Sequence, residues 1–345
     1  MPTIAEAMDL YYKLSFNDRI TFYATLSNTI HTDGDDLQGF LMETRFADSR
    51  VCIYCESSHI VKNGRRSDGT QRFLCRDCGR TFVPASGTVS SWTHKRLSVW
   101  KKYIDCMMDK KTLKVSAEEC GISMGTAFAW RHKILDSLQR MADHVILGGT
   151  VEADETFVNV SFKGNHHGKN GFRMPKESHK RGNDIHTGGL SDDKVCILCA
   201  VDPAGIPVSK AGKTGKVSSA CVEKVLADRI RPDSILCTDN EKAYLRYAKE
   251  HGLCLIQMET DRRTAGQYTI QRINAYHSHL KGFLSCFGGV SSKYLNNYLA
   301  WYNLFFCTKK ERRETAALIL GQALTERMRQ RYRDIPVRDP VPSLG

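Results

Sequence analysis

The stretch LGGTVEADETFVNVSF, residues 147–162, decides the fold of the larger part of this chain. It is rich in β-branched and apolar residues, which predicts a β-strand. The elements expected after it, in chain order, are the strand KVCILCAVD (194–202), a short strand at 206–208, a helix at 218–230, the strand SILCTD (234–239), a helix at 241–252, the strand LCLIQM (253–258) and a long helix from about Thr269. This alternation predicts an α/β domain whose mixed sheet is flanked by helices.

A polar, Gly-rich segment interrupts the pattern between the first two strands. Residues 163–189 are too polar for a core element, and six Lys or Arg stand against one Glu over 163–182. We therefore expect an excursion from the sheet. Its histidines have spacings that fit no metal-ligand pattern, so they are expected to be solvated; they are His166, His167, His179 and His186.

Acidic residues lie near the ends of two of the predicted strands. Asp154 stands toward the end of VEADETF, and Asp239 ends ILCTD where the chain leaves the sheet. Because carboxyl edges of α/β sheets hold active sites, these side chains are candidate ligands for Mg²⁺ or Mn²⁺. Such ions activate a water or a 3′-hydroxyl in phosphodiester transfer. Asp239 has the alternative role of capping the helix that follows it.

Further toward the N-terminus, four cysteines form two Cys-x-x-Cys knuckles. Cys52 and Cys55 make the first, Cys75 and Cys78 make the second, and 19 residues separate them. Two such knuckles offer four thiolates, which is a ligand set for structural Zn²⁺. Two short strands, HIVKNG and QRFLC, lie between the knuckles and complete the pattern of a zinc ribbon.

The predicted ribbon is basic. Arg65, Arg66 and Arg72 lie between the two knuckles, and cations outnumber anions around the site. Cations that face phosphates release condensed counterions, so we interpret the ribbon as a DNA contact. A ribbon with a purely structural role is the alternative.

The segment 93–140 has the apolar period of helices. Ser116, with Glu119 three residues on, predicts a capping box that opens a short helix; Gly121 predicts a turn, and Ser123 the cap of a second helix. This is the helix-turn-helix pattern, whose second helix enters the major groove of DNA, although any pair of antiparallel helices looks similar. The side chains expected to contact DNA from that helix are Thr126, Arg131 and Lys133.

The composition agrees with a nucleic-acid partner. Fifty Lys and Arg against thirty-eight Asp and Glu give a net charge of +12, which favours a polyanion such as double-stranded DNA. No apolar run is long enough to span a bilayer, and the first residues lack the order of a secretory signal. We therefore expect a protein of the cytoplasm with no membrane partner.

The last predicted helix of the α/β region opens IQRINAYHSHLK, residues 270–281. Together with the Cys52–Phe82 ribbon, VEADETF, CTDNEKAY and GGVSSKYLNNYLAWY, it closely resembles the zinc-ribbon transposases of bacterial insertion sequences. The resemblance covers most of residues 50 to 305 in the right order. It is to the subgroup whose Asp-Asp-Glu triad ends in Asn and is followed by Lys.

The resemblance implies a ribonuclease H-like catalytic domain and assigns four catalytic residues. The two family aspartates match Asp154 and Asp239, the third position falls on Asn274, and the family lysine falls on Lys281. Asn274 and Lys281 are seven residues apart and therefore share a helix face, about 10 Å apart along the axis. His277 shares that face and is expected either to contact DNA or to pack. Asn274 would complete the Mg²⁺ site, and Glu259 is its rival as third ligand.

The function implied is that of a DDE-type transposase, which binds terminal inverted repeats, cleaves DNA and joins it to target DNA, as a homodimer or larger assembly on DNA. The resemblance also implies that it acts at the bacterial nucleoid. The alternatives are a DNA-binding regulator derived from a transposase with an inactive catalytic domain, and a repair or junction nuclease. The domains expected are an N-terminal helical segment (1–48), a zinc ribbon (49–85), a helix-turn-helix region (90–145), a catalytic domain (148–308) and a C-terminal helical tail (309–345).

Overall fold

The computed structural model describes residues 50–164, 193–259, 264–308, 312–328 and 330–339, and also residues 39, 41, 42, 45 and 46. The chain divides into two compact units, of which the first comprises residues 1–138 and 310–332. The second comprises residues 139–309 and 333–345. The expected N-terminal helices and the excursion with its four histidines fall largely outside the described residues.

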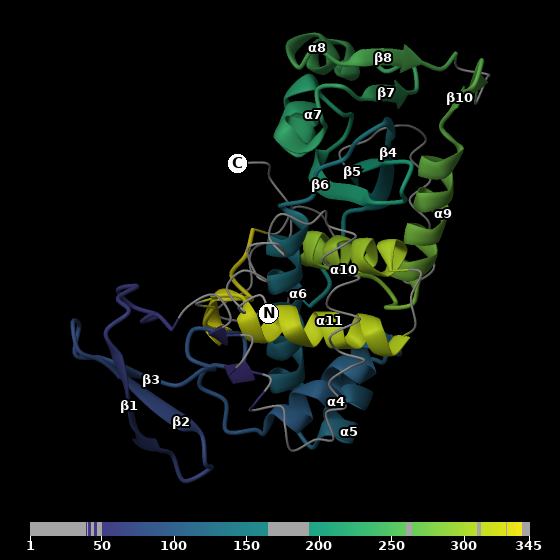
Figure 1. Ribbon diagram of the computed structural model, residues 1–345. Helices are drawn as coiled ribbons and strands as arrows, with labels where there is room; N and C mark the ends of the chain where they lie inside the picture. Colours follow the sequence, from purple (N-terminus) through teal and green to yellow (C-terminus); the bar gives the residue numbers. More distant parts are fainter. Residues whose placement is uncertain are drawn as a thin grey trace. The chain divides into compact units, whose positions relative to one another are not determined.

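The second unit contains a five-stranded sheet with the order β6-β5-β4-β7-β8 (Figure 1). Its strands are β4 (Thr150–Asn159), β5 (Lys194–Val201), β6 (Pro207–Thr214), β7 (Ile235–Thr238) and β8 (Cys254–Gln257). The first three are joined antiparallel, whereas β7 and β8 run parallel to β4. This mixed order is that of the ribonuclease H-like fold, so the expected fold class is confirmed.

Helices cover both faces of this sheet. They are α7 (Ser219–Leu226), α8 (Ala243–Glu250), α9 (Gln271–Ser285) and α10 (Leu295–Cys307). Helix α7 packs on β5 and β6 and α8 on β8, whereas α9 packs on β4 and β5 and α10 on β6. Side chains alternate between the two faces along each strand. In β4, Glu155 points toward α8, whose Tyr244 it contacts, and Glu152 points toward α9, whose Ile273 it contacts.

Two details of this unit differ from the expectation. Strand β6 is eight residues long rather than three, because an edge strand tolerates polar side chains such as Ser209 and Lys210 that hide its apolar pattern. A small hairpin precedes α9, formed by β9 (Thr264–Ala265) and β10 (Tyr268–Thr269). The helix expected from about Thr269 therefore begins at Gln271.

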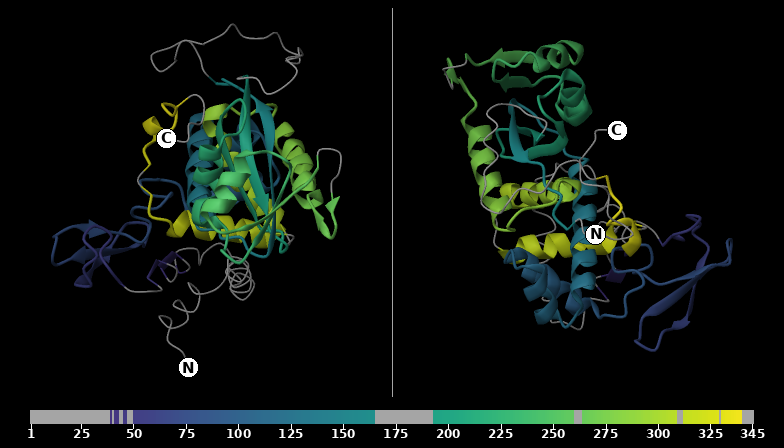
Figure 2. Two further views of the ribbon diagram at one scale, coloured as in Figure 1. Left: turned by 90° about the horizontal axis from the view of Figure 1, so that it is seen from above. Right: turned by 180° about the vertical axis from the view of Figure 1, so that it is seen from behind.

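The first unit holds a small antiparallel sheet of its own, with the order β1-β2-β3 (Figure 1). Two further views show it in the dark blue part of the chain (Figure 2). Its strands are β1 (Ile60–Arg65), β2 (Gln71–Cys75) and β3 (Thr81–Phe82). The same unit contains the helices α4 (Leu97–Met108), α5 (Leu113–Cys120), α6 (Met124–Ala142), which continues into the second unit, and α11 (Arg312–Thr325). Trp100 of α4 stacks on Trp130 of α6, with 3.7 Å between the ring centroids.

The start of α5 corrects one expectation. The capping side chain is Thr112, whose Oγ1 accepts a hydrogen bond from Val115 N at 3.3 Å, so the helix begins one turn earlier than the predicted box. Ser116 is buried inside the helix, and Glu119 forms an ion pair with Lys111 at 2.8 Å instead of reaching back to a cap.

The turn between α5 and α6 agrees with the expectation. Gly121 has a φ of 58°, a left-handed conformation that suits glycine, and Ser123 Oγ accepts a hydrogen bond from Thr126 N at 3.1 Å. Within the described residues, no helix combines the length and the apolar composition that a membrane span requires.

Candidate functional site

Two aspartates meet at the end of the central sheet. The parallel pairing of β4 with β7 places Glu152 opposite Cys237, and continuing this register brings Asp239, one residue beyond β7, level with Asp154. Each offers a carboxylate oxygen within 4.8 Å of the other. The convergence expected from the sequence is therefore present in the structure.

A third carboxylate, Glu155, belongs to the same cluster. Its ligand atom also lies within 4.8 Å of those of Asp154 and Asp239, although it is the neighbour of Asp154 on the strand. Glu155 points to the α8 face, where Tyr244 Oη donates a hydrogen bond to its Oε2 at 2.9 Å. Because β7 ends at Thr238, Asp239 lies beyond the strand. Side chains from either face of β4 can therefore approach its carboxylate. The sequence reasoning missed Glu155.

The raised pKa values of the three carboxyl groups indicate that the site would bind a cation favourably. Burial, reinforced by the charge of Asp239, raises the pKa of Asp154 to about 7. Burial also raises the pKa of Glu155 to about 7 and raises that of Asp239. Oxygen donors that repel one another when ionised suit a divalent cation such as Mg²⁺ or Mn²⁺, which would offset that repulsion.

One face of α9 borders this cluster. His277 Nδ1 lies 3.7 Å from Asp154 Oδ2, and its Nε2 is buried without a hydrogen-bond partner in the described structure. Burial and the charge of Lys281 lower the pKa of His277 to about 4, so the ring is neutral at physiological pH. Lys281 is exposed and its charge lowers the pKa of Asp154, while Asn274 is half-buried one turn before His277.

A buried glutamate fixes the start of α9. The residue before this helix, Ile270, offers no capping side chain, and Glu152 of β4 replaces it by accepting a hydrogen bond from Ile273 N at 3.0 Å. Glu152 is only 1% exposed and also pairs with Arg272 at 3.1 Å. A negative charge at a helix N-terminus is favourable, and here it ties α9 to the strand that carries Asp154.

The two alternatives for this region find no support in the geometry. Asp239 Oδ1 accepts a hydrogen bond from Glu241 N at 3.1 Å, but α8 starts only at Ala243, so Asp239 is not its cap. Glu259 is exposed and is absent from the acidic cluster found among the described residues.

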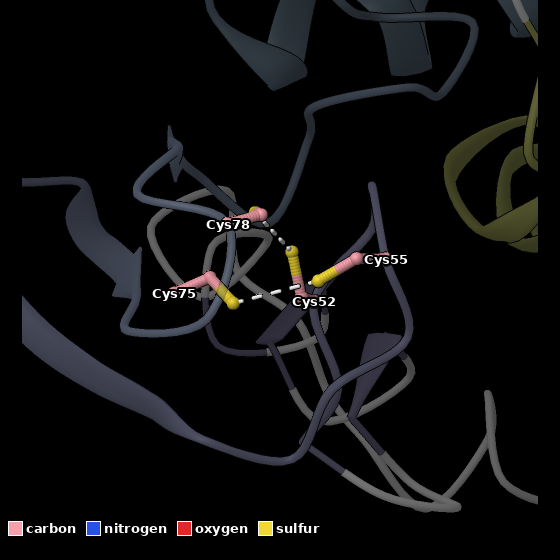
Figure 3. Close-up of side chains that lie close together, drawn as sticks. All are labelled: Cys52, Cys55, Cys75 and Cys78. Carbon is pink, nitrogen blue, oxygen red and sulfur yellow. Dashed lines mark hydrogen bonds between the residues drawn. The ribbon is translucent and has the colours of Figure 1, made fainter.

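The four ribbon cysteines form a second cluster (Figure 3). Their sulfur atoms all lie within 4.8 Å of one another, with 3.6 Å between the Sγ atoms of Cys52 and Cys78 and between those of Cys55 and Cys75. Backbone N–H groups, that of Cys78 first, lower the pKa of Cys75 to about 6. A tetrahedral Zn²⁺ requires four such sulfur ligands, so this cluster could hold one.

The two knuckles have the same backbone geometry. Glu56 N donates to Cys52 O at 2.9 Å, and the equivalent Gly79 N donates to Cys75 O at 3.0 Å. Both residues have positive φ, 61° and 68° respectively. Gly79 adopts this conformation without strain because it lacks a Cβ, whereas Glu56 adopts it with a side chain.

Comparison with known proteins identifies the region around the carboxylates. Residues 146–302 match the family model described as the ISXO2-like transposase domain. Over 269 residues the chain is 23% identical to an uncharacterized protein in transposable element ISH50 of Halobacterium salinarum, covering 76% of this chain and 87% of the relative. The resemblance to insertion-sequence transposases is thus confirmed.

Two solved structures also resemble the chain. They are a pre-cleavage Mos1 transpososome, at 11% identity and a TM-score of 0.28, and the Mos1 mariner paired end complex with Mn, at 13% and 0.27. Each match covers 64% of this chain and 74% of the other. Scores this low do not bear on function.

Outside the transposase domain, the candidate DNA-contacting residues are unequally placed. Arg65 and Arg66 of the ribbon are exposed, and Arg72, Thr126 and Lys133 are half-buried. The structure contradicts the expected DNA contact of Arg131, because this side chain is buried, only 2% exposed, and donates a hydrogen bond to Lys111 O at 2.8 Å. Arg131 therefore ties α6 to the segment before α5, within the first unit.

Proposed function

We propose that this chain is a DDE-type transposase that cleaves the ends of its element and joins them to target DNA. The observation that carries the proposal is the cluster of Asp154, Glu155 and Asp239 inside an ISXO2-like transposase domain. A second class, a DNA-binding regulator, rests only on Asn274 standing where many relatives have Glu, and the carboxylate of Glu155 weakens that argument.

The carboxylates act by holding divalent cations against the DNA. Asp154 and Asp239 are the central ligands, with Glu155 and the amide oxygen of Asn274 at either side. Mg²⁺ or Mn²⁺ bound there would activate a water or 3′-hydroxyl and stabilise the departing oxygen. Lys281, exposed at the edge of the cluster, binds a phosphate of the scissile strand. Neutral His277 orients Asp154 without competing for its charge.

DNA recognition belongs to the first unit. The ribbon, folded around Zn²⁺ at its four cysteines, presents Arg65 and Arg66 to phosphates, as a net charge of +12 favours. Helix α6 contributes Thr126 from its first turn and Lys133 from its middle. Arg131 supports this surface from within and does not contact the DNA.

The test of this function is cleavage of a defined substrate. Purified protein should nick a duplex that carries the terminal repeat of its own element in 5 mM Mg²⁺ or Mn²⁺, roughly the range in which such cations bind weakly, and should join the end to a plasmid. EDTA should abolish both reactions. Specific binding without any nicking would instead establish the regulator, and nicking of all duplexes alike would indicate a general nuclease.

The identity of the third ligand gives a separate prediction. We expect Asn274→Ala and Glu155→Gln each to lower the nicking rate by roughly 100-fold, as is usual for residues that hold or orient metal ligands. The matched control Glu259→Gln should remain within about twofold of wild type. Nicking rates measured across a Mn²⁺ titration separate the roles, because a ligand variant needs more metal. An inactive Glu259→Gln beside an active Asn274→Ala would move the third ligand to Glu259.

A further inference from the structure

One tryptophan of the first unit is fully exposed. Trp92 lies between the ribbon and α4 and is 99% exposed, whereas the other three tryptophans of the chain are buried: Trp100, Trp130 and Trp301. Its φ is 62°, a left-handed backbone conformation that a side chain with a Cβ adopts rarely. A backbone in this sparsely populated region that also holds a large aromatic ring in water points to a role for the ring outside the fold.

The segment that carries Trp92 is internally fixed. Ser91 Oγ donates to Ala85 O at 2.7 Å, and Thr88 Oγ1 and Ser90 Oγ lie 3.0 Å apart in the interior. Just beyond, Thr93 Oγ1 accepts a hydrogen bond from Lys95 N at 3.2 Å. These hydrogen bonds before and after Trp92 fix the backbone that carries it. The ring is therefore exposed on an ordered segment.

Exposed polar residues follow Trp92 in the chain, and one of them contacts the α5–α6 turn. His94, Lys95 and Arg96 are all exposed, and Lys95 Nζ donates to the carbonyl of Gly121 at 2.9 Å. This bond ties the Trp92 segment to the turn from which α6 begins. Exposed cations next to an exposed aromatic residue complement a nucleic acid, because the cations can pair with phosphates and the ring can stack on a base.

We propose that Trp92 is a DNA-contacting residue, which stacks on a base or base step while Lys95 and Arg96 hold the adjoining phosphates. This inference rests on the proposed function, because it assumes that DNA is the partner. Stacking of a base on an aromatic side chain is sequence-tolerant, so Trp92 adds affinity and positions the DNA at the α5–α6 turn.

The experiment compares Trp92→Ala with Trp92→Phe and with Leu245→Ala, an exposed apolar control in the other unit. Binding of terminal-repeat duplex, measured by fluorescence anisotropy, should weaken about 5- to 100-fold for Trp92→Ala and much less for Trp92→Phe. The salt dependence of binding should not change. Lys95→Ala or Arg96→Ala should instead reduce the slope of log K against log salt by about one.

Trp92 also provides its own optical signal. Since the other three tryptophans are buried, acrylamide should quench mainly Trp92, and bound DNA should protect it. Unchanged quenching on DNA, or Trp92→Ala binding within twofold of wild type, would overturn the inference and leave the proposed function intact. Loss of self-association in Trp92→Ala without loss of DNA binding would assign the ring to a second copy of the chain. Failure of the wild-type protein to bind any DNA would overturn both proposals.

Discussion

Asp239→Asn should reduce end cleavage by roughly 1000-fold or more, while repeat-end binding stays at the wild-type level. The substitution keeps the shape of the side chain and removes the charge that holds the cation against Asp154 and Glu155. The same result is expected for Asp154→Asn. Single-turnover nicking and anisotropy binding on the same duplex measure the two effects separately. Asp233→Asn, an exposed change before β7, is the matched control and should cleave normally.

The same variants should not harm the fold of the metal-free protein. The pKa of Asp154 is raised to about 7 from its ordinary 3.8, chiefly by burial, so its ionised form opposes folding. This penalty is absent below the ordinary pKa of 3.8, grows as the pH rises from there to about 7, and is complete above about 7. Asp154→Asn removes the charge, so at pH 8 its thermal midpoint without metal should equal or exceed that of wild type. An inactive variant with a much lower midpoint would mean that Asp154 serves folding and would contradict the assignment.

Local sequence patterns predict the sheet and the proximity of Asp154 and Asp239. Strands β4, β5 and β7 are apolar enough to show their period, and an aspartate at a strand end points to the sheet edge. Glu155 was not predicted as a site residue because side chains alternate along a strand, so that Glu155 and Asp154 are expected on opposite faces of the sheet. This rule is weaker here because the neighbouring strand β7 has ended before Asp239. The role of Glu152 was not predicted because an acidic residue in a strand is expected to face solvent. Its contact with the start of α9 is visible only in the structure.

The mistake at Arg131 has a different cause. Its place in the helix after a predicted turn suggests a cation that faces the DNA groove, yet Arg131 shares the period of Ala127, Ile134 and Leu138, which belong to the buried face of α6. Helical periodicity could have found this, since i, i+4, i+7 and i+11 lie on one side. What sequence could not provide is the carbonyl of Lys111 that satisfies the guanidinium.

Removal of zinc should have the second large effect, and it should be confined to the first unit. Cys75→Ser is expected to lose the bound metal, which elemental analysis should find at about one per chain in the wild-type protein. Binding of terminal-repeat duplex should weaken with it, since Arg65 and Arg66 are carried by the ribbon. Cys286→Ser, at an exposed cysteine of the other unit, should keep both metal and binding.

The size of this effect follows from the smallness of the ribbon. In the part of the chain that the structure describes, its apolar core contains two buried aromatic side chains, Phe73 and Phe82, besides Cys52 and Cys75 themselves, and the apolar residues packed around them are partly exposed. Structural Zn²⁺ supplies on the order of 10 kcal/mol to small domains of this kind, more than two stacked rings can replace. Limited proteolysis of Cys75→Ser should therefore cut within residues 50–85 while the α/β unit survives intact. A zinc-free ribbon that resists the protease, or unchanged zinc content in Cys75→Ser, would refute the four-cysteine site.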